Sequence, residues 1–194
     1  LKGKCSNCSK PISILYPLVE LTTALVTLLL YMNYWLNWEL IVTITLFYTL
    51  IVLSLIDLKY KAVPDYLLII AVILTIIVGD LMNILIFAGG FALLELIVTF
   101  YIQNVKAKIT KNKDLETQSA LGEGDIPIAG VIGGLLGLHL GISAIFLATL
   151  LGLSLSIYNL LSKKEIETPF IPFLSLGLFI TFITGFNIFS WFLR

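Results

Sequence analysis

The sequence has little charge: 12% of its residues are Asp, Glu, Lys or Arg, against 59% hydrophobic residues and a mean hydropathy of +1.04. A soluble domain of 194 residues could not bury that much apolar surface, so the composition excludes a soluble globular protein. Short segments of alternating polarity are also lacking, which argues against a transmembrane β-barrel. The formal net charge is zero, so nothing indicates a nucleic-acid partner.

Long apolar runs fill most of the chain instead. They predict an all-α, polytopic helical membrane protein with about seven transmembrane helices in the lipid bilayer, because each run approaches the length that a bilayer requires. No cleavable signal peptide and no internal repeat is visible. We expect the segments near residues 18–36, 40–56, 66–78, 84–101, 126–138, 142–161 and 170–192.

The lysines give these segments an orientation. If the N-terminus lies inside, every lysine falls in an inner polar segment, and Arg194 is the only other cation. Such a bias follows the positive-inside rule, so we expect a cytoplasmic N-terminus and an odd number of spans. The same orientation places Asp57 and Asp125 at the cytoplasmic ends of their helices.

These two aspartates interrupt the apolar pattern. Asp57 closes one apolar run, and Asp125 opens another within Gly122-Glu-Gly-Asp125. An ionisable residue in a membrane helix is costly and suggests a functional role. Two carboxylates that share one proton suit aspartic protease chemistry, in which one activates water and the other protonates the scissile carbonyl. Taken singly, Asp57 also fits a helix-end carboxylate and Asp125 a helix N-cap; read as a pair, they favour a catalytic site.

Further polar residues are expected around this pair. The glycines of the motif lack side chains, so an extended peptide could approach the backbone beside Asp125. Asp65 follows Pro64 and is expected to cap the next helix or to lie at the rim of the site. Glu20 stands near the start of the first segment, at the same predicted face. We therefore predict a substrate-binding rim of Gly122, Glu123, Gly124, Asp65 and Glu20.

Cysteine is scarce, and its only two copies form Cys5-Ser-Asn-Cys8. The cytosol is reducing, so a structural disulfide is not expected. The spacing suits half of a four-cysteine zinc site, but the chain has no second pair, and two free thiols are the simpler interpretation. Residues 103–123 form the longest polar stretch, which we expect to be a cytoplasmic loop that serves as a connector or controls substrate access.

Four sequence blocks resemble the type IV prepilin peptidases, which are bacterial GxGD membrane aspartic proteases. The first runs from Cys5 through Pro11 to Glu20-Leu21 and the second from Ile56-Asp57 to Pro64-Asp65. Gly122-Glu-Gly-Asp125 is the third, and the proline-containing Thr168-Pro-Phe-Ile-Pro172-Phe is the fourth. They occur in the family's order and cover nearly the whole chain.

The resemblance implies an endopeptidase of the bacterial inner membrane with its active site facing the cytoplasm. It implies cleavage of type IV prepilins and type II secretion pseudopilins after a glycine, with Asp57 and Asp125 as the catalytic pair and no cofactor for proteolysis. Residues 17–194 would form the protease domain, and residues 1–16 the remnant of a zinc and methyltransferase region. Many members also methylate the new N-terminal residue with S-adenosylmethionine.

The chain departs from the family at its start. The usual first membrane helix and first C-x-x-C are absent, so zinc would need Cys5, Cys8 and cysteines outside this chain, and methylation depends on that same region. The leading Leu1 suggests a fragment or a processed chain. No feature of the sequence indicates an oligomeric state.

Two other classes of function stay open. A preflagellin or presenilin-like GxGD protease would share the aspartates, although the C-x-x-C argues against the preflagellin type. A small proton- or cation-coupled transporter would use Asp57, Glu95 and Asp125 as ion sites along one path. A protease requires Asp57 and Asp125 to meet, whereas a transporter would place Glu95 with them.

Overall fold

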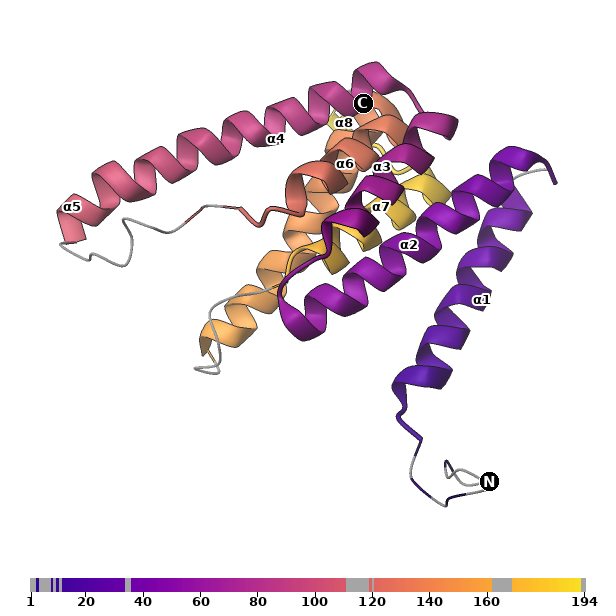
Figure 1. Cartoon of the computed structure of the whole chain (residues 1–194). Coiled ribbons are helices and arrows are strands. Elements are labelled where there is room, and N and C mark those ends of the chain that lie inside the picture. Colours follow the sequence, from indigo (N-terminus) through magenta and orange to yellow (C-terminus); the bar gives the residue numbers. More distant parts are fainter. Residues whose placement is uncertain are drawn as a thin grey trace.

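The computed structural model describes residues 3, 8, 10, 12–33, 36–110, 119, 121–161 and 169–192, with the backbone alone at 110, 191 and 192. All regular structure in these ranges is helical, which confirms the predicted all-α membrane protein (Figure 1). Four helices are long and apolar enough to cross a membrane. The elements are α1 (Leu15–Asn33), α2 (Trp38–Tyr60), α3 (Asp65–Val78), α4 (Leu81–Tyr101), η1 (Ile102–Lys106), α5 (Ala107–Thr110), α6 (Asp125–Leu161), α7 (Ile171–Thr184) and α8 (Ile188–Phe192).

Helix α2 has clear signals at both ends. At its start the Asn37 side chain accepts a hydrogen bond from the Leu40 N–H over 2.9 Å. At its end Lys61 adopts a left-handed conformation with φ 51°, and its N–H donates to the Asp57 carbonyl oxygen. The chain then turns into α3 within a few residues, so Asp57 is held in the last full turn of a well-defined helix.

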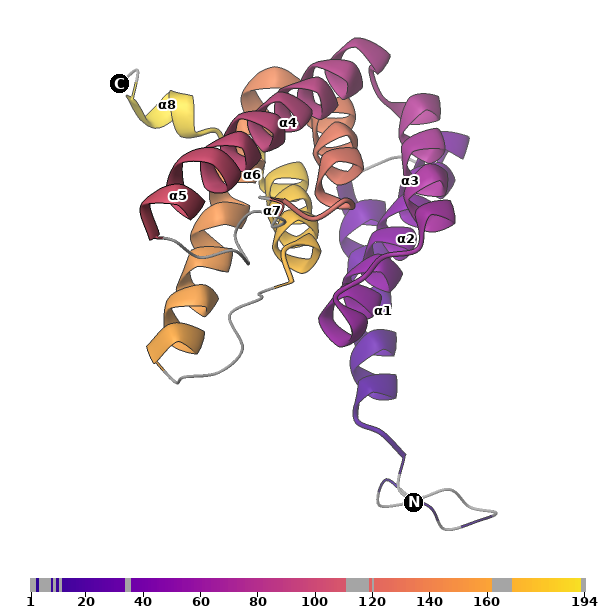
Figure 2. The same ribbon diagram turned by 60° about the vertical axis from the view of Figure 1, so that its left-hand side comes forward.

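Helix α6 is broken at Gly137, whose φ of 71° and ψ of −175° are not helical. The two parts, residues 125–136 and 138–161, run in opposite directions in Figure 2. This agrees with the two separate segments predicted near 126–138 and 142–161. The Asp80 N–H donates to the carbonyl oxygen of Gly134 over 3.0 Å, which gives a partner to a carbonyl next to the break.

The sequence predicted one segment near residues 170–192, but the structure divides it into two helices. Helix α7 ends at Thr184 because Gly185 adopts the left-handed conformation, with φ 64°, and its N–H donates to the Thr181 carbonyl oxygen. The short α8 follows after this turn.

The polar stretch 103–123 also differs from the prediction at its beginning. Helix α4 passes through one π-helical segment, η1, into α5, so the chain stays helical as far as Thr110. The predicted loop therefore begins later than the polar composition suggested, and most of its centre lies outside the described residues.

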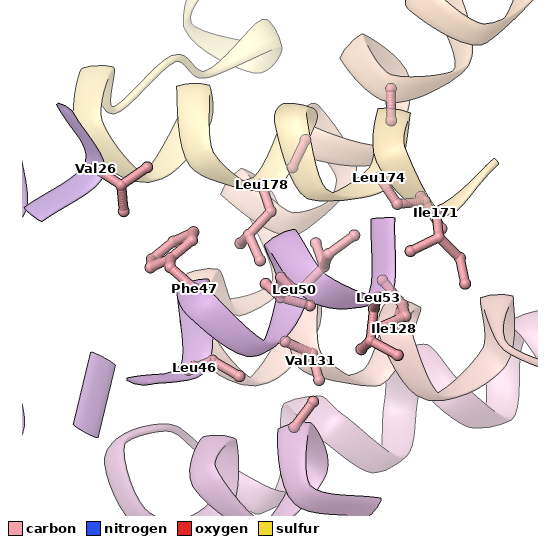
Figure 3. Close-up of a cluster of buried hydrophobic side chains, with 14 of the residues drawn as sticks. Val26, Leu46, Phe47, Leu50, Leu53, Ile128, Val131, Ile171, Leu174 and Leu178 are labelled. Carbon is pink, nitrogen blue, oxygen red and sulfur yellow. The ribbon is translucent and has the colours of Figure 1, made fainter. Parts of the chain in front are cut away.

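The apolar core lies directly beside the two aspartates. In Figure 3 the side chains of α2 lie between those of α7 and the first part of α6. Each of these helices contributes a buried residue three or four positions from its own site residue, which is Asp57, Asp125 or Ile171, so packing in the core brings these parts of the three helices together. These residues are Leu53 on α2, Ile128 on α6 and Leu174 on α7.

Candidate active site

Asp57 lies in the last turn of α2 and is only 7% exposed. Its Oδ2 atom accepts a hydrogen bond from the backbone N–H of Ile171 over 3.2 Å. Ile171 is the first residue of α7, and its neighbour Phe170 makes no side-chain cap bond. The carboxylate therefore satisfies a free N–H at the positive end of a helix, which favours a negative charge there.

Asp125 is the first residue of α6 and is 6% exposed. Its Oδ2 accepts a hydrogen bond from the Gly122 N–H over 3.1 Å, and its own N–H donates to the Gly122 carbonyl oxygen over 3.0 Å. Asp125 therefore does not act as a simple N-cap. Its two hydrogen bonds to Gly122 close a turn, and this turn holds the carboxyl group at the start of the helix.

The structure places both predicted aspartates on elements that meet at the start of α7. Ile171 connects them: its N–H binds Asp57, and a Cβ built at Gly124 would lie 2.9 Å from its Cδ1 atom. The loop after α2 closes the site, since the same Cβ would lie 3.5 Å from Val63 Cγ2.

The two glycines of the motif have different surroundings. Gly122 is exposed, and a Cβ there would lie 3.3 Å from Asp125 Oδ2. Gly124 is buried against Ile171 and Val63, so its missing side chain permits close packing, and this differs from the open backbone that we expected at both positions. The sequence indicated that glycine was needed here but could not indicate which neighbour required it.

The other predicted rim residues are all at the surface. Glu123 is exposed beside Asp125, and Glu20 is exposed on α1, the outermost helix in Figure 1. Asp65 is exposed as the first residue of α3, but Pro64 occupies the N-cap and no side-chain cap bond is made. The expected capping role of Asp65 is therefore wrong, and its position in the rim stays a prediction.

The cysteine pair is only partly described. Cys8 is exposed and free, and Cys5 lies outside the described residues. Among the residues that the structure describes, no three His, Cys, Asp or Glu side chains gather to hold a metal ion. These residues do not form a zinc site by themselves.

Sequence reasoning missed two residues of the site and undervalued a third. Ile171 and Val63 are ordinary apolar residues, and no sequence pattern distinguishes them from the rest of the core. Glu95 on α4 is half-buried. The sequence connected it with the aspartates only as an ion site of the transporter alternative, because a carboxylate within an apolar run suggests a function.

Comparison with known proteins identifies similar sequences along the whole chain. The profile of the Type IV leader peptidase family matches residues 44–157, and that of the Bacterial Peptidase A24 N-terminal domain matches residues 1–34. Prepilin leader peptidase/N-methyltransferase of Aeromonas hydrophila is 29% identical over 202 residues, covering 100% of this chain and 66% of the relative. The protein of the same name from Bacillus subtilis (strain 168) is 25% identical over 203 residues, covering 100% and 75%.

The Pseudomonas aeruginosa protein with that name is 28% identical over 193 residues, covering 95% of this chain and 63% of its own length. The chain thus spans about two thirds of the length of several curated relatives that it matches. No solved structure matches it.

Proposed function

This chain belongs to the type IV leader peptidase family, and from that premise we propose that it is an aspartic endopeptidase of the bacterial inner membrane. Its substrates are type IV prepilins and type II secretion pseudopilins, which it cleaves after a glycine on the cytoplasmic side. One arrangement carries the proposal. The buried Asp57 accepts a hydrogen bond from the Ile171 N–H, and Gly124, the residue before the buried Asp125, lies against the Ile171 side chain.

The proposed reaction uses the aspartates as one unit that shares a proton. The ionised carboxyl takes a proton from a water molecule, whose oxygen attacks the scissile carbonyl carbon. The neutral carboxyl gives its proton to the carbonyl oxygen, so a neutral diol forms. Its collapse breaks the C–N bond. The amine leaves with the proton of the pair, and one hydroxyl group of the diol returns its proton to the pair, so the dyad again holds one proton. The acid and base behaviour belongs to the pair, so we assign neither role to one residue.

The two carboxyl groups accept hydrogen bonds from different parts of the chain, and this difference suits the proposed chemistry. Asp57 receives an N–H from a helix that begins 114 residues later in the chain, whereas Asp125 receives one from its own turn. Each carboxyl therefore has a fixed backbone donor on its Oδ2 atom. These donors hold the groups in place before a substrate arrives, which reduces the cost of reaching the reactive geometry.

The rim of the proposed site would bind the leader segment. Gly122 and Glu123 are exposed immediately beside the buried Asp125, and Asp65 is exposed at the start of α3. Exposed carboxylates suit the short basic leader that precedes the scissile bond. Glu20 on α1 would contribute from the edge, and the chain after residue 110 would control access.

The proposed organisation has two parts. Residues 17–194 form the protease domain, and residues 1–16 form a cytoplasmic cysteine-containing segment. Methylation of the new N-terminal residue from S-adenosylmethionine, and zinc held by Cys5, Cys8 and further cysteines, are proposed only for the full-length protein.

A transporter is the second candidate, and Glu95 is the observation that favours it. It is half-buried within the apolar helix α4, as expected for a carboxylate along an ion path. The two functions differ in what the aspartates do. A protease loses peptide cleavage without either aspartate, whereas a transporter would lose coupled ion movement and would never cleave a peptide.

The test is cleavage of a prepilin by the purified full-length protein, with mass analysis of the product's N-terminus to report cleavage and methylation together. Asp57→Asn and Asp125→Asn should each abolish cleavage while the protein stays folded, as judged by gel filtration and helical circular dichroism. Asp80→Asn is the matched control, because Asp80 caps α4 by accepting the Met82 N–H, and asparagine caps equally well. Cleavage by either dyad variant would refute the assignment.

A further inference from the structure

We propose that Ile171 is the residue that positions the two catalytic aspartates relative to each other. Its backbone N–H fixes Asp57, and its side chain fixes Gly124 and, through it, Asp125. The inference rests on the proposed protease function and deepens it by naming a positioning residue. Ile171 lies beyond residues 44–157, the part of the chain that matches the family profile, so that match assigns it no role.

The backbone part of the argument concerns the start of α7. The first N–H groups of a helix have no partner within the helix and need one elsewhere. The N-cap residue Phe170 makes no side-chain bond, and Ile171 instead donates to Asp57 Oδ2 over 3.2 Å in a buried position. Because the donor belongs to the main chain of a helix, Asp57 cannot move unless α7 moves with it.

The side-chain part concerns the turn before Asp125. Ile171 is 2% exposed, so the surrounding core limits the rotation of its side chain. A Cβ at Gly124 would lie 2.9 Å from Ile171 Cδ1, a distance that real Cβ atoms essentially never show. The turn from Gly122 to Asp125 is therefore seated against the Ile171 side chain, and the position of the Asp125 carboxyl depends on it.

A second contact links α7 to α2 near the site. Ser54, three residues before Asp57, lies 3.1 Å from Ser175, four residues after Ile171, measured between their hydroxyl oxygens. The two helices are therefore linked at the level of the site and again about one turn away. Ile171 cannot slide along α2 without breaking the serine contact, so the spacing of the dyad is defined by the packing of α7.

The first experiment tests the side-chain contact by compensation. Gly124→Ala should lower kcat for prepilin cleavage on the order of tenfold or more, because a displacement of a fraction of an ångström in a catalytic group is costly. Ile171→Val removes the Cδ1 atom that the new methyl group meets. The double variant Gly124→Ala, Ile171→Val should therefore recover kcat to within roughly threefold of Ile171→Val alone.

Gly133→Ala, on the helix α6 that follows Gly124, provides the matched control. A Cβ at Gly133 would collide with the Phe87 ring and come within 2.7 Å of the Asn83 carbonyl oxygen, neither of which Ile171→Val changes. Ile171→Val should therefore leave the Gly133→Ala defect uncorrected. Equal recovery of both alanine variants, or no recovery of Gly124→Ala, would overturn the proposal. If Gly124→Ala does not fold, the yield of folded protein replaces kcat as the readout, with the same outcomes.

The second experiment removes only the N–H. Incorporation of the α-hydroxy acid analogue of isoleucine at position 171 replaces the amide by an ester and keeps the side chain. Loss of a donor to a carboxylate disfavours its charged form, so the acidic limb of the pH–kcat profile should move to higher pH. The same exchange at Met82, whose N–H donates to Asp80 Oδ1 over 3.1 Å, should leave the profile unchanged.

An unchanged pH–kcat profile for the ester at position 171 would overturn the proposal that the Ile171 N–H positions Asp57. A purely structural role would alter stability without shifting the pH dependence. Failure of the proposed function is recognised separately. If the unmodified protein does not cleave any prepilin, the protease assignment fails. Suppose instead that the unmodified protein cleaves a prepilin and Asp57→Asn does not. Negative results in the compensation and pH experiments would then refute only the role of Ile171.

Discussion

Asp125 and Gly122 are joined in both directions, since the Gly122 N–H donates to Asp125 Oδ2 over 3.1 Å and the Asp125 N–H donates to the Gly122 carbonyl oxygen over 3.0 Å. This closed turn fixes a carboxyl group at the start of α6 through four consecutive residues. The turn also places Gly122 directly against the carboxyl group, since a Cβ built at Gly122 would lie 3.3 Å from Asp125 Oδ2.

Gly122→Ala should therefore reduce activity more than stability. The methyl group requires the Asp125 carboxyl to shift by a few tenths of an ångström, and we expect kcat to fall on the order of tenfold. The free energy of unfolding should change by less than about 1 kcal/mol, because Gly122 is exposed and its surroundings can relax. Kinetic assays and thermal unfolding in detergent measure the two effects.

Gly90→Ala is the control for that comparison, because nothing lies within 4 Å of a Cβ at Gly90 in α4. It should leave kcat unchanged and leave stability equal or slightly higher, as alanine favours helix. A fall in kcat for Gly90→Ala equal to that for Gly122→Ala would contradict the role given to the Gly122–Asp125 turn.

The break in α6 depends on a backbone conformation that is essentially restricted to glycine. Gly137 has φ 71° and ψ −175°, whereas Gly185 at the end of α7 has φ 64° and ψ 23°. Asparagine tolerates the second conformation but not the first. Gly137→Asn should lower the free energy of unfolding by about 1–3 kcal/mol, and Gly185→Asn by clearly less. Equal losses in thermal unfolding would show that the break does not depend on this dihedral strain.

Much of the fold was predictable because bilayer thickness and hydrogen bonding allow few solutions. Apolar runs of sufficient length predicted the helices. The interruption at Gly185 was not predictable, since the sequence on both sides of it is equally apolar. A single left-handed residue ends the helix there, and hydropathy does not report on dihedral angles.

The residues of the site also fall into those that the sequence identified and those that it did not. Asp57 and Asp125 were recognisable because charge is rare in an apolar helix, and that rarity is visible in sequence. Ile171 and Val63 were not recognisable, because they act through close packing and a backbone N–H, which any apolar residue could provide. The role of Gly124 was foreseen only as a need for space, and the identity of the neighbour required three-dimensional contacts.

The serine pair between α2 and α7 should contribute little energy despite its position beside the site. Ser54 Oγ and Ser175 Oγ lie 3.1 Å apart, and Ser54 also donates to the Leu50 carbonyl oxygen over 2.7 Å. Interhelical hydrogen bonds in membrane proteins average about 0.6 kcal/mol in double-mutant cycles. A cycle of Ser54→Ala and Ser175→Ala should give a coupling energy of roughly that size. A coupling above about 2 kcal/mol would show that this contact dominates the α2–α7 interface.

Gly79→Ala should destabilise the protein without changing the chemistry of the folded fraction. A Cβ at Gly79 would lie 2.5 Å from the Gly134 carbonyl oxygen and 2.9 Å from the Thr75 carbonyl oxygen. Both are main-chain atoms of packed helices, so neither can turn aside as a flexible side chain could. We expect a loss of about 1–3 kcal/mol, as for other overpacked sites.

The expected effect on activity is different, because Gly79 meets the first part of α6 at the end opposite to Asp125. The kcat per folded molecule should therefore stay within about twofold of the unchanged protein, since distant sites usually act independently. Gly89→Ala, with nothing within 4 Å of its built Cβ, should alter neither quantity appreciably. Thermal unfolding together with active-site-normalised kinetics separates the two effects, and a large drop in kcat for Gly79→Ala would mean that the α3–α6 contact controls the dyad from its far end.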